Sequence, residues 1–268
     1  MSKRLKSLVL LTLMTILVSA SGDKDEKSEK MSVGKEYHPS GTKGGPMVLV
    51  PAGAFWMGCN KQVDELCKAE EKPFHKVYLD AFYIDKFLVT QAEYNECVSS
   101  GKCQANRKYP GFTGDRQPVV GLSWDDAKTY CEWAGKRLPT EAEWEKTARG
   151  TDGRVYPWGH TIDTGRANYV DSKINKTSNV GSYPSGASPY GALDMAGNVT
   201  EWVSDWYDGS YYQNSPSKNP KGTDSGTQRV VRGGFWFDDA RYLRSSFRDR
   251  NDPTSRDNSI GGFRCLRD

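Results

Sequence analysis

Histidines and closely spaced cysteine pairs are scarce in this sequence. Its 268 residues include only three histidines, His38, His75 and His160, which lie far apart, and no C-x-x-C pair. A structural zinc site needs four nitrogen or sulfur ligands, usually at short regular spacings. We therefore expect no zinc site.

The sequence also lacks an excess of either charge. It has 37 basic and 34 acidic residues, which gives a net charge of +3. Nucleic acids and anionic membranes attract strongly basic surfaces, so we expect neither as a partner. With 36% hydrophobic and 12% aromatic residues, a chain of this length can bury a substantial core.

Long apolar runs are absent except at the start of the chain. The basic segment MSKRLK precedes the apolar segment SLVLLTLMTILVSA, which ends in small residues and is short for a membrane span. We predict a bacterial-type signal peptide over residues 1–20, export to the periplasm or the medium, and no stable membrane span after cleavage. An uncleaved membrane anchor is the alternative. Lipid attachment is excluded at Ser21, because a lipoprotein signal needs cysteine there.

Residues 21–46 have almost no large apolar side chains. They are rich in charged residues, glycine and serine, and such a segment buries too little surface to offset its ordering entropy. We predict a flexible linker over 21–46, followed by one folded domain over 47–268.

Six cysteines in an exported protein indicate disulfides. The spacing favours two short-range pairs, Cys59–Cys67 and Cys97–Cys103, and leaves Cys131 and Cys265 as a long-range pair. Sequence alone does not determine the connectivity.

Three helices are indicated by capping boxes, in which a hydroxyl is followed three residues later by a carboxylate. We expect helices to begin at Thr90, Ser123 and Thr140 and to end at the glycines 101, 135 and 150. Cys131 should lie on the buried stripe of the second helix. Strands are indicated by short β-branched or aromatic runs within residues 47–58, 75–84, 229–237 and 261–268. Residues 151–228 are expected to be largely irregular.

Seven motifs occur in a characteristic order. They are MVLVPAGAFWMG, DAFYIDKFLVTQAEY, QPVVGLSWDDAKTYCEWAGKRLPTEAEWEKTARG, YPWG, YGALDMAGNVTEWVSDWY, RVVRGGFWF and GGFRC. Together they resemble the formylglycine-generating enzyme (sulfatase-modifying factor) family over essentially all of residues 47–268. The resemblance implies an α+β, C-type-lectin-like fold with little regular secondary structure, held by disulfides. It also implies a structural disulfide between Cys131 and Cys265.

Enzymes of that family oxidise a cysteine of a sulfatase with oxygen and a copper(I) ion held by two thiolates. The resemblance places Asp238 and Leu243 at the two thiolate positions, after Gly233 and Gly234. A carboxylate is a hard ligand and leucine has no donor atom, whereas Cu(I) is soft. We therefore expect no copper, no catalytic residue at these positions and no formylglycine generation.

Two other enzymatic branches of the family are relevant. The sulfoxide synthases use iron bound by several histidines, and three scattered histidines argue against that activity. Maturation factors for small molecules such as siderophores lack a clear metal site and take part in oxidation. An oxidoreductase acting on a peptide or small molecule thus stays the alternative function.

The family's structural calcium sites match this sequence in part. The first corresponds to Ala196, Gly197 and Val199, which would offer mainly backbone oxygens, and to Glu201, which would offer a carboxylate. Calcium prefers such a mixture of oxygens. Asn168 and Tyr169 match the start of the second site. Without calcium, Asn198 would occupy a left-handed turn and Glu201 would pair with an arginine.

Residues 229–268 contain nine arginines and six aspartates but no lysine or glutamate. One interpretation is a network of Arg–Asp pairs that holds irregular loops together. The other is a ligand cleft formed by Trp236, Phe237, Asp238, Asp239, Arg241 and Arg244. The leading hypothesis is accordingly a monomeric binding module for an unidentified protein, peptide or small molecule.

Overall fold

The computed structural model describes residues 32–257 and 260–268. The expected signal peptide over residues 1–20 lies outside these residues, as does the expected linker up to residue 31. Within the described ranges, no helix has the length and apolar character needed to cross a membrane.

The three predicted helices are confirmed. They are α1 (Gln91–Ser99), α2 (Trp124–Trp133) and α3 (Glu141–Arg149), and each has a complete capping box at the expected threonine or serine. Cys131 and Tyr130 lie on the buried face of α2, as the periodicity predicts. Local hydrogen bonding at the helix start is therefore enough to define these elements.

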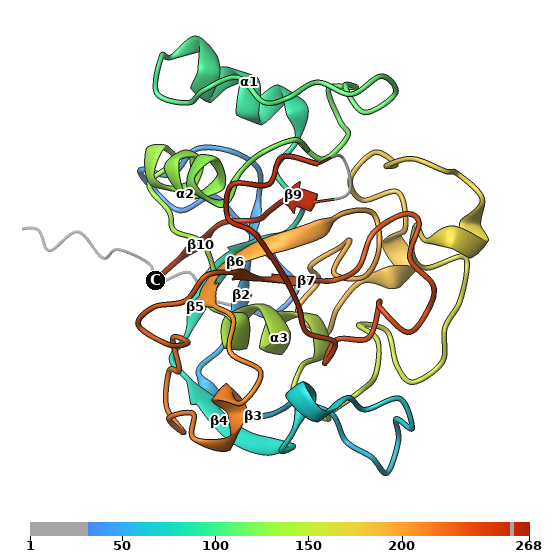
Figure 1. Cartoon of the computed structure of the whole chain (residues 1–268). Helices are drawn as coiled ribbons and strands as arrows, with labels where there is room; N and C mark the ends of the chain where they lie inside the picture. Colours follow the sequence, from blue (N-terminus) through green and yellow to red (C-terminus); the bar gives the residue numbers. More distant parts are fainter. Residues whose placement is uncertain (1–31, 258–259) are drawn as a thin grey trace, which may run out of the picture. The chain divides into compact units, whose positions relative to one another are not determined.

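The strands form two four-stranded sheets and one hairpin (Figure 1). The first sheet has the order β1-β2-β5-β10 and is antiparallel, whereas β3 pairs only with β4. The second sheet has the order β8-β7-β6-β9, in which β6 and β9 are parallel. The bounds are β1 Glu36–Tyr37, β2 Met47–Val50, β3 Gly53–Met57, β4 His75–Leu79, β5 Phe82–Asp85, β6 Thr200–Trp206, β7 Arg229–Arg232, β8 Asp249–Asn251, β9 Ile260–Gly262 and β10 Leu266–Arg267.

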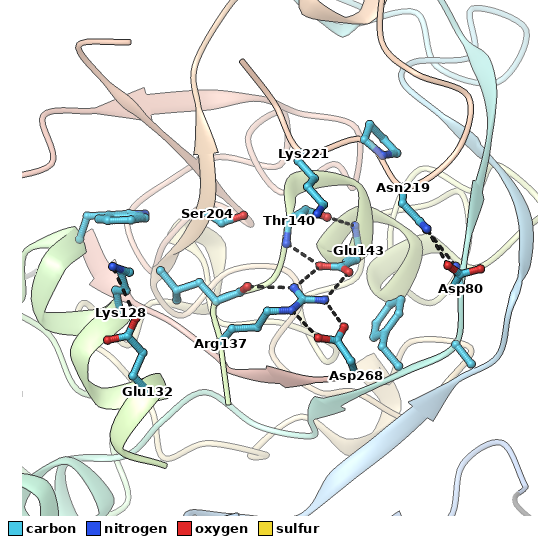
Figure 2. A pocket seen from close by; sticks show the side chains of 15 residues that line it. Asp80, Lys128, Glu132, Arg137, Thr140, Glu143, Ser204, Asn219, Lys221 and Asp268 are labelled. Carbon is cyan, nitrogen blue, oxygen red and sulfur yellow. Dashed lines mark hydrogen bonds and ion pairs between the residues drawn. The ribbon is translucent and has the colours of Figure 1, made fainter. Parts of the chain in front are cut away.

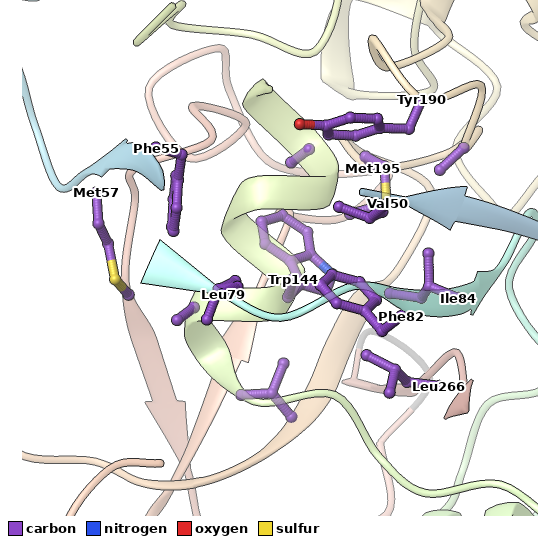
Figure 3. Close-up of a cluster of buried hydrophobic side chains, with 14 of the residues drawn as sticks. Val50, Phe55, Met57, Leu79, Phe82, Ile84, Trp144, Tyr190, Met195 and Leu266 are labelled. Carbon is purple, nitrogen blue, oxygen red and sulfur yellow. The ribbon is translucent and has the colours of Figure 1, made fainter. Parts of the chain in front are cut away.

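Helix α3 is central to the larger hydrophobic core. It packs against β3 and β6, and its Trp144 is fully buried among side chains of β2, β3, β4 and β5 (Figure 3). A second core surrounds α2 and contains Trp202 from β6. A tryptophan buries a large apolar area, which explains how few regular elements can enclose these cores.

Two expectations from the sequence need correction. Residues Thr200–Trp206 form β6, the longest strand, inside the segment expected to be irregular. The strand is buried on both faces, so it shows no polar–apolar alternation that could reveal it. In addition, β1 pairs with β2, so ordered structure begins before Met47, within the expected linker.

All three predicted disulfides are present. They join Cys59 to Cys67, Cys97 to Cys103, and Cys131 to Cys265. The last pair links α2 to the segment just before β10 across 134 residues and lies in the core around α2. The fold is thus mixed α and β with limited regular structure, as the family resemblance implies.

Candidate functional site

The loop after β7 begins with two glycines whose backbone conformation other residues adopt only with strain. Gly233 and Gly234 have φ angles of 94° and 69°. A Cβ atom on Gly234 would lie 3.0 Å from Cδ1 of Leu243. Leu243 itself is fully buried in a small apolar cluster with Tyr156 and Ala196. Leu243 is therefore a packing residue of this loop.

Asp238 lies in the same loop and is partly buried. Its carboxylate accepts a hydrogen bond from the Phe235 N–H at 3.1 Å, and its carbonyl accepts one from the Val170 N–H at 3.0 Å. Burial raises the pKa of Asp238 to about 7, and the negative charges of Asp249 and Asp239 act in the same direction. Near neutral pH this carboxyl can either donate or accept a proton.

Aromatic side chains surround Asp238 in the sequence and lie at the surface. Phe237 is 60% exposed, and its ring centroid is 5.5 Å from that of Trp236. Trp236 also contacts Phe112, and its indole Nε1 is buried and has no hydrogen-bond partner among the described residues. A buried donor without a partner is unfavourable.

Asp239 and Arg241 form an ion pair at the surface. The distance between their charged atoms is 2.7 Å, and both side chains are largely exposed. Exposed pairs contribute little to stability. We call Trp236, Phe237, Asp238, Asp239 and Arg241 the loop surface; Phe237 and Arg241 are exposed and the other three are partly buried. That these residues form a ligand cleft stays a prediction.

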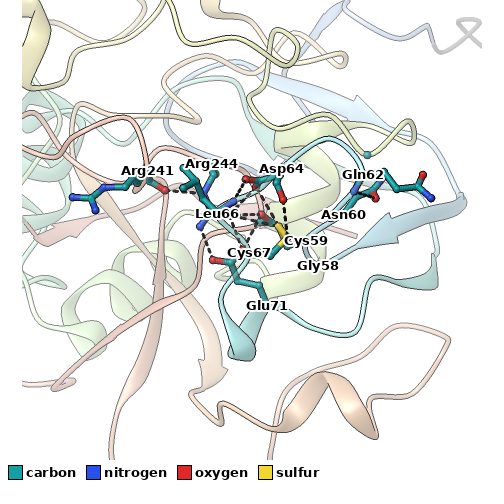
Figure 4. Close-up of a disulfide and its surroundings, with 12 residues drawn as sticks. Gly58, Cys59, Asn60, Gln62, Asp64, Leu66, Cys67, Glu71, Arg241 and Arg244 are labelled. Atoms are coloured by element: carbon teal, nitrogen blue, oxygen red, sulfur yellow. Dashed lines mark hydrogen bonds and ion pairs between the residues drawn. A yellow bond between two sulfur atoms is a disulfide. The ribbon is translucent and has the colours of Figure 1, made fainter.

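Arg244 does not belong to the loop surface, which corrects the prediction. Its side chain is buried and pairs with Glu71 at 2.6 Å and with Asp64 at 2.8 Å, beside the Cys59–Cys67 disulfide (Figure 4). Its Nε also donates to the carbonyl of Arg241. Arg244 thus supports the loop from the interior. The acidic partners lie more than 170 residues earlier in the chain, so no residue near Arg244 in the sequence indicates them.

The expected network of Arg–Asp pairs is also different in the structure. The buried arginines of residues 229–268 pair mainly with glutamates from elsewhere in the chain: Arg232 with Glu145, Arg244 with Glu71 and also with Asp64, Arg248 with Glu141 and Arg264 with Glu201. When an arginine and a carboxylate are both buried, each must find hydrogen-bond partners within the protein, and a bidentate contact provides them. These pairs connect the C-terminal segment to the rest of the fold rather than its loops to one another.

The residues predicted to bind calcium come together at the start of β6. Gly197 and Asn198 adopt left-handed conformations, with φ angles of 76° and 67°. The Asn198 N–H donates to the Asn168 carbonyl at 2.8 Å, so the two predicted sites are neighbours. Ala196 and Val199 are buried beside them. The Tyr169 carbonyl accepts a hydrogen bond from the Ser172 hydroxyl.

Glu201 on β6 has an arginine partner. Both of its carboxylate oxygens accept hydrogen bonds from Arg264, at 2.7 and 3.0 Å. This geometry matches the alternative considered from the sequence. A calcium ion at this position would therefore compete with the Arg264 guanidinium for the Glu201 carboxylate.

A second buried carboxylate, Asp194, lies near this pair and was missed in the sequence. Its φ angle is 57°, and it accepts a hydrogen bond from the Gly181 N–H at 2.7 Å. Burial raises its pKa to about 6; the Glu201 charge contributes to the rise, whereas Arg264 and a hydrogen bond from Asn198 oppose it. Asp194 and Glu201 are thus two carboxylates within the influence of the Arg264 charge, and Glu201 is the one that forms an ion pair with it. This oxygen-rich surplus of negative charge suits a hard cation. The only sequence signal was its position three residues before Gly197.

The cysteines offer no pair of thiolates. All six are in disulfides, and none is free. Cys59, Asp64 and Cys67 place potential ligand atoms within 4.8 Å of one another. However, the two sulfur atoms are bonded to each other, and Arg244 Nη1 lies 3.7 Å from the Cys59 sulfur. This donor set does not fit copper(I).

Comparison with protein families gives one clear match. The family model described as "Sulfatase-modifying factor enzyme 1-like domain" matches residues 35–268. The solved structure of PvdO from Pseudomonas aeruginosa superposes with a TM-score of 0.75 and 29% identity, covering 88% of this chain and 99% of that one.

Three relatives illustrate the range of similar proteins. A Chlamydia pneumoniae protein named serine/threonine-protein kinase pkn1 is 39% identical over 82% of this chain, which spans only 38% of that relative. The formylglycine-generating enzyme of Streptomyces coelicolor is 33% identical, over 88% of this chain and 92% of the relative. Hercynine oxygenase of Mycolicibacterium smegmatis is 31% identical, over 81% of this chain and 61% of the relative.

Proposed function

Because this chain belongs to the sulfatase-modifying factor enzyme 1-like domain family, we propose that it is an exported, non-catalytic member that binds a ligand at the loop surface. The ligand would be a protein, a peptide or a small molecule. The chain would not make formylglycine, although its family includes enzymes named for that reaction.

The state of the cysteines carries this proposal. Copper(I) chemistry of the kind expected in the family needs two thiolates, and all six cysteines are in disulfides. At the positions that the resemblance assigns to the thiolates, Asp238 offers oxygen and Leu243 offers no donor. Leu243 is also fully enclosed by apolar side chains.

The loop surface has properties that suit binding. Phe237 presents an exposed apolar ring, and Asp239 with Arg241 provides both charges. Aromatic residues and arginine often dominate the energy of binding interfaces. Asp238, with its pKa near 7, would make binding sensitive to pH around neutrality.

The enzymatic part of the proposal is tested with a cysteine-containing sulfatase peptide. We expect the purified chain to contain no stoichiometric copper or iron and to consume no oxygen with this peptide. A peptide with serine in place of the cysteine is the control. Stoichiometric copper or iron together with oxygen uptake that requires the cysteine would overturn the proposal.

The binding part is tested by screening peptides and small molecules for thermal stabilisation of the chain. Ligands of the loop surface should lose their effect in Phe237→Ala and Arg241→Ala. Tyr78→Ala is the matched control, because Tyr78 is an exposed aromatic residue on β4. A ligand that still stabilises both loop variants but no longer stabilises Tyr78→Ala would bind outside the loop surface.

An oxidoreductase acting on a peptide or small molecule is the second candidate. The similarity to hercynine oxygenase favours it, as does a carboxyl at Asp238 that can exchange a proton near pH 7. Oxygen uptake with a substrate other than the sulfatase peptide, abolished by Asp238→Asn, would support this candidate over the binding module.

We also propose a structural calcium ion held near Glu201 and the backbone of Ala196, Gly197 and Val199, with Asp194 as a further carboxylate. The surplus of negative charge over Arg264 supports it. Calcium would stabilise the fold and leave no open position for a substrate. Added Ca²⁺ should raise the melting temperature, and Asp194→Asn should reduce that rise. A melting temperature that responds to neither Ca²⁺ nor chelator would contradict the site.

Export to the periplasm or the medium is part of the same proposal. Three disulfides support it, since such bonds persist in oxidising compartments. A monomeric state and the absence of a nucleic-acid partner are predictions from the sequence. Fractionation of the producing cells, with detection of the cleaved chain, tests the location.

A further inference from the structure

One cavity of the described chain lies away from the loop surface. Its volume is about 440 Å³, and it is lined by one face of α2, the start of α3, Ser204 of β6 and the segment 219–221 (Figure 2). No residue of 233–244 lines it. Small-molecule sites commonly have volumes in this range.

Apolar side chains form much of the lining. Phe82, Leu138 and Pro220 contribute, together with Trp124 at the start of α2. The Trp124 ring is fixed, because its Nε1 donates to the Val203 carbonyl at 2.7 Å and the guanidinium of Arg229 stacks 3.6 Å from its centre. A rigid indole of this kind can contact a flat apolar ligand without losing side-chain entropy.

The charged lining residues are almost all paired. Arg137 binds Glu143 at 2.8 Å and also Asp268, while Lys128 pairs with Glu132. Asp80 pairs with Lys218, which is outside the lining. Within the described ranges, Lys221 is the one charged lining residue without an ion pair closer than 4 Å. Its charge acts on Asp268 only at longer range.

Thr140 supplies a second unpartnered donor. In α1 and α2 the capping hydroxyl donates to the carboxylate three residues later. In α3 that carboxylate, Glu143, binds both terminal nitrogens of Arg137, and among the described residues the Thr140 hydroxyl has no acceptor. Thr140 is 7% exposed and lines the same cavity as Lys221. One cation and one hydroxyl donor without an acceptor therefore both line this partly apolar cavity.

We propose that this cavity binds a small organic anion with a flat apolar body, such as an aryl carboxylate. Its carboxylate accepts hydrogen bonds from Lys221 Nζ and the Thr140 hydroxyl, and its ring packs against Trp124 and Leu138. The charge-assisted bond determines the preference for an anion. The site is independent of the loop surface and of the function proposed for it.

The test uses three probes that share an indole ring: indole-3-acetate, tryptamine and indole-3-ethanol, which are anionic, cationic and neutral. In calorimetric titrations, indole-3-acetate should bind most tightly, and its affinity should fall with added salt. Equal binding of tryptamine, or no binding of indole-3-acetate at millimolar concentration, would overturn the proposal.

Variants of exposed lysines locate the site without disturbing the fold. Lys221→Met should weaken indole-3-acetate binding by about threefold to tenfold, and Lys221→Arg should preserve it. Lys76→Met is the matched control, because Lys76 is an exposed lysine on β4 outside the lining. Equal losses in the two methionine variants, or no loss in Lys221→Met, would contradict the assignment. Phe237→Ala should have no effect, which separates this site from the loop surface.

Discussion

The side chain of Leu243 packs directly against the backbone of Gly234. A Cβ atom at position 234 would lie 3.0 Å from Leu243 Cδ1 and equally close to the Tyr242 carbonyl oxygen. Residues 234–243 thus form a compact loop. Within it, Asp238 and Phe235 are joined by two hydrogen bonds, one donated by each residue. The two positions assigned to copper ligands by resemblance lie in one preformed loop.

Cysteines at these two positions should therefore create a copper(I) site. We expect the variant Asp238→Cys/Leu243→Cys to bind Cu(I) much more tightly than the unmodified chain, because thiolates are the soft ligands that Cu(I) prefers. Competition against a chromogenic Cu(I) chelator measures the gain, with ascorbate as the reductant so that native disulfides persist.

The single variants Asp238→Cys and Leu243→Cys are the controls and should show a smaller gain. Replacing buried Leu243 removes apolar volume, so folding must be checked by circular dichroism. A folded double variant with no gain in affinity would mean that the two positions do not correspond to the thiolate positions of the family.

The elements that were predicted from the sequence depend on local chemistry. Thr90, Ser123 and Thr140 define helix starts through hydrogen bonds to residues three positions away. The short disulfide Cys97–Cys103 is of the same kind. Such features are readable because both partners lie within one turn or one short loop.

The features that were missed depend on distant partners. Arg244 resembles Arg241 in the sequence, yet it is buried because Glu71 and Asp64 lie beneath the loop. Strand β6 has no alternating pattern because both of its faces are covered. Neither fact is determined by neighbouring residues, so only the folded arrangement reveals them.

The different roles of Arg244 and Arg241 lead to unequal effects on stability when each is replaced. Arg244→Met would leave Glu71 and Asp64 buried without their cation, and breaking a buried pair of this kind typically costs about 3–5 kcal/mol. Arg241→Met should leave the free energy of unfolding unchanged, because Arg241 is exposed. Urea denaturation of both variants measures the difference. Similar stabilities would show that Arg244 is not a structural residue.

Asp205 should make the protein less stable as the pH rises. This carboxyl is buried next to Glu141, and burial together with the Glu141 charge raises its pKa to about 7. In the unfolded chain it loses its proton near pH 4. Between pH 4 and 7 the folded state therefore binds more protons, and the unfolding free energy falls with increasing pH.

The variant Asp205→Asn isolates this effect. An asparagine oxygen can still accept the hydrogen bonds from the Glu141 N–H and the Ser204 hydroxyl. The stability of the variant relative to the unmodified chain should increase from pH 4 to pH 7, by on the order of a few kcal/mol, and stay constant above pH 8. A difference that is independent of pH in urea denaturation would show that Asp205 is not protonated in the folded state near neutrality.

The long-range disulfide should contribute more stability than a short one. Cys131–Cys265 closes a loop with a sequence separation of 134, whereas Cys97–Cys103 has a separation of 6, and all four cysteines are buried. The chain-entropy model gives about 5 kcal/mol for the longer loop and about 2 kcal/mol for the shorter one. The variants Cys131→Ala/Cys265→Ala and Cys97→Ala/Cys103→Ala remove the same atoms, so their difference cancels most of the packing loss. Urea denaturation without reductant should find the first variant less stable. Equal losses would mean that restriction of the unfolded chain is not how these bonds stabilise the fold.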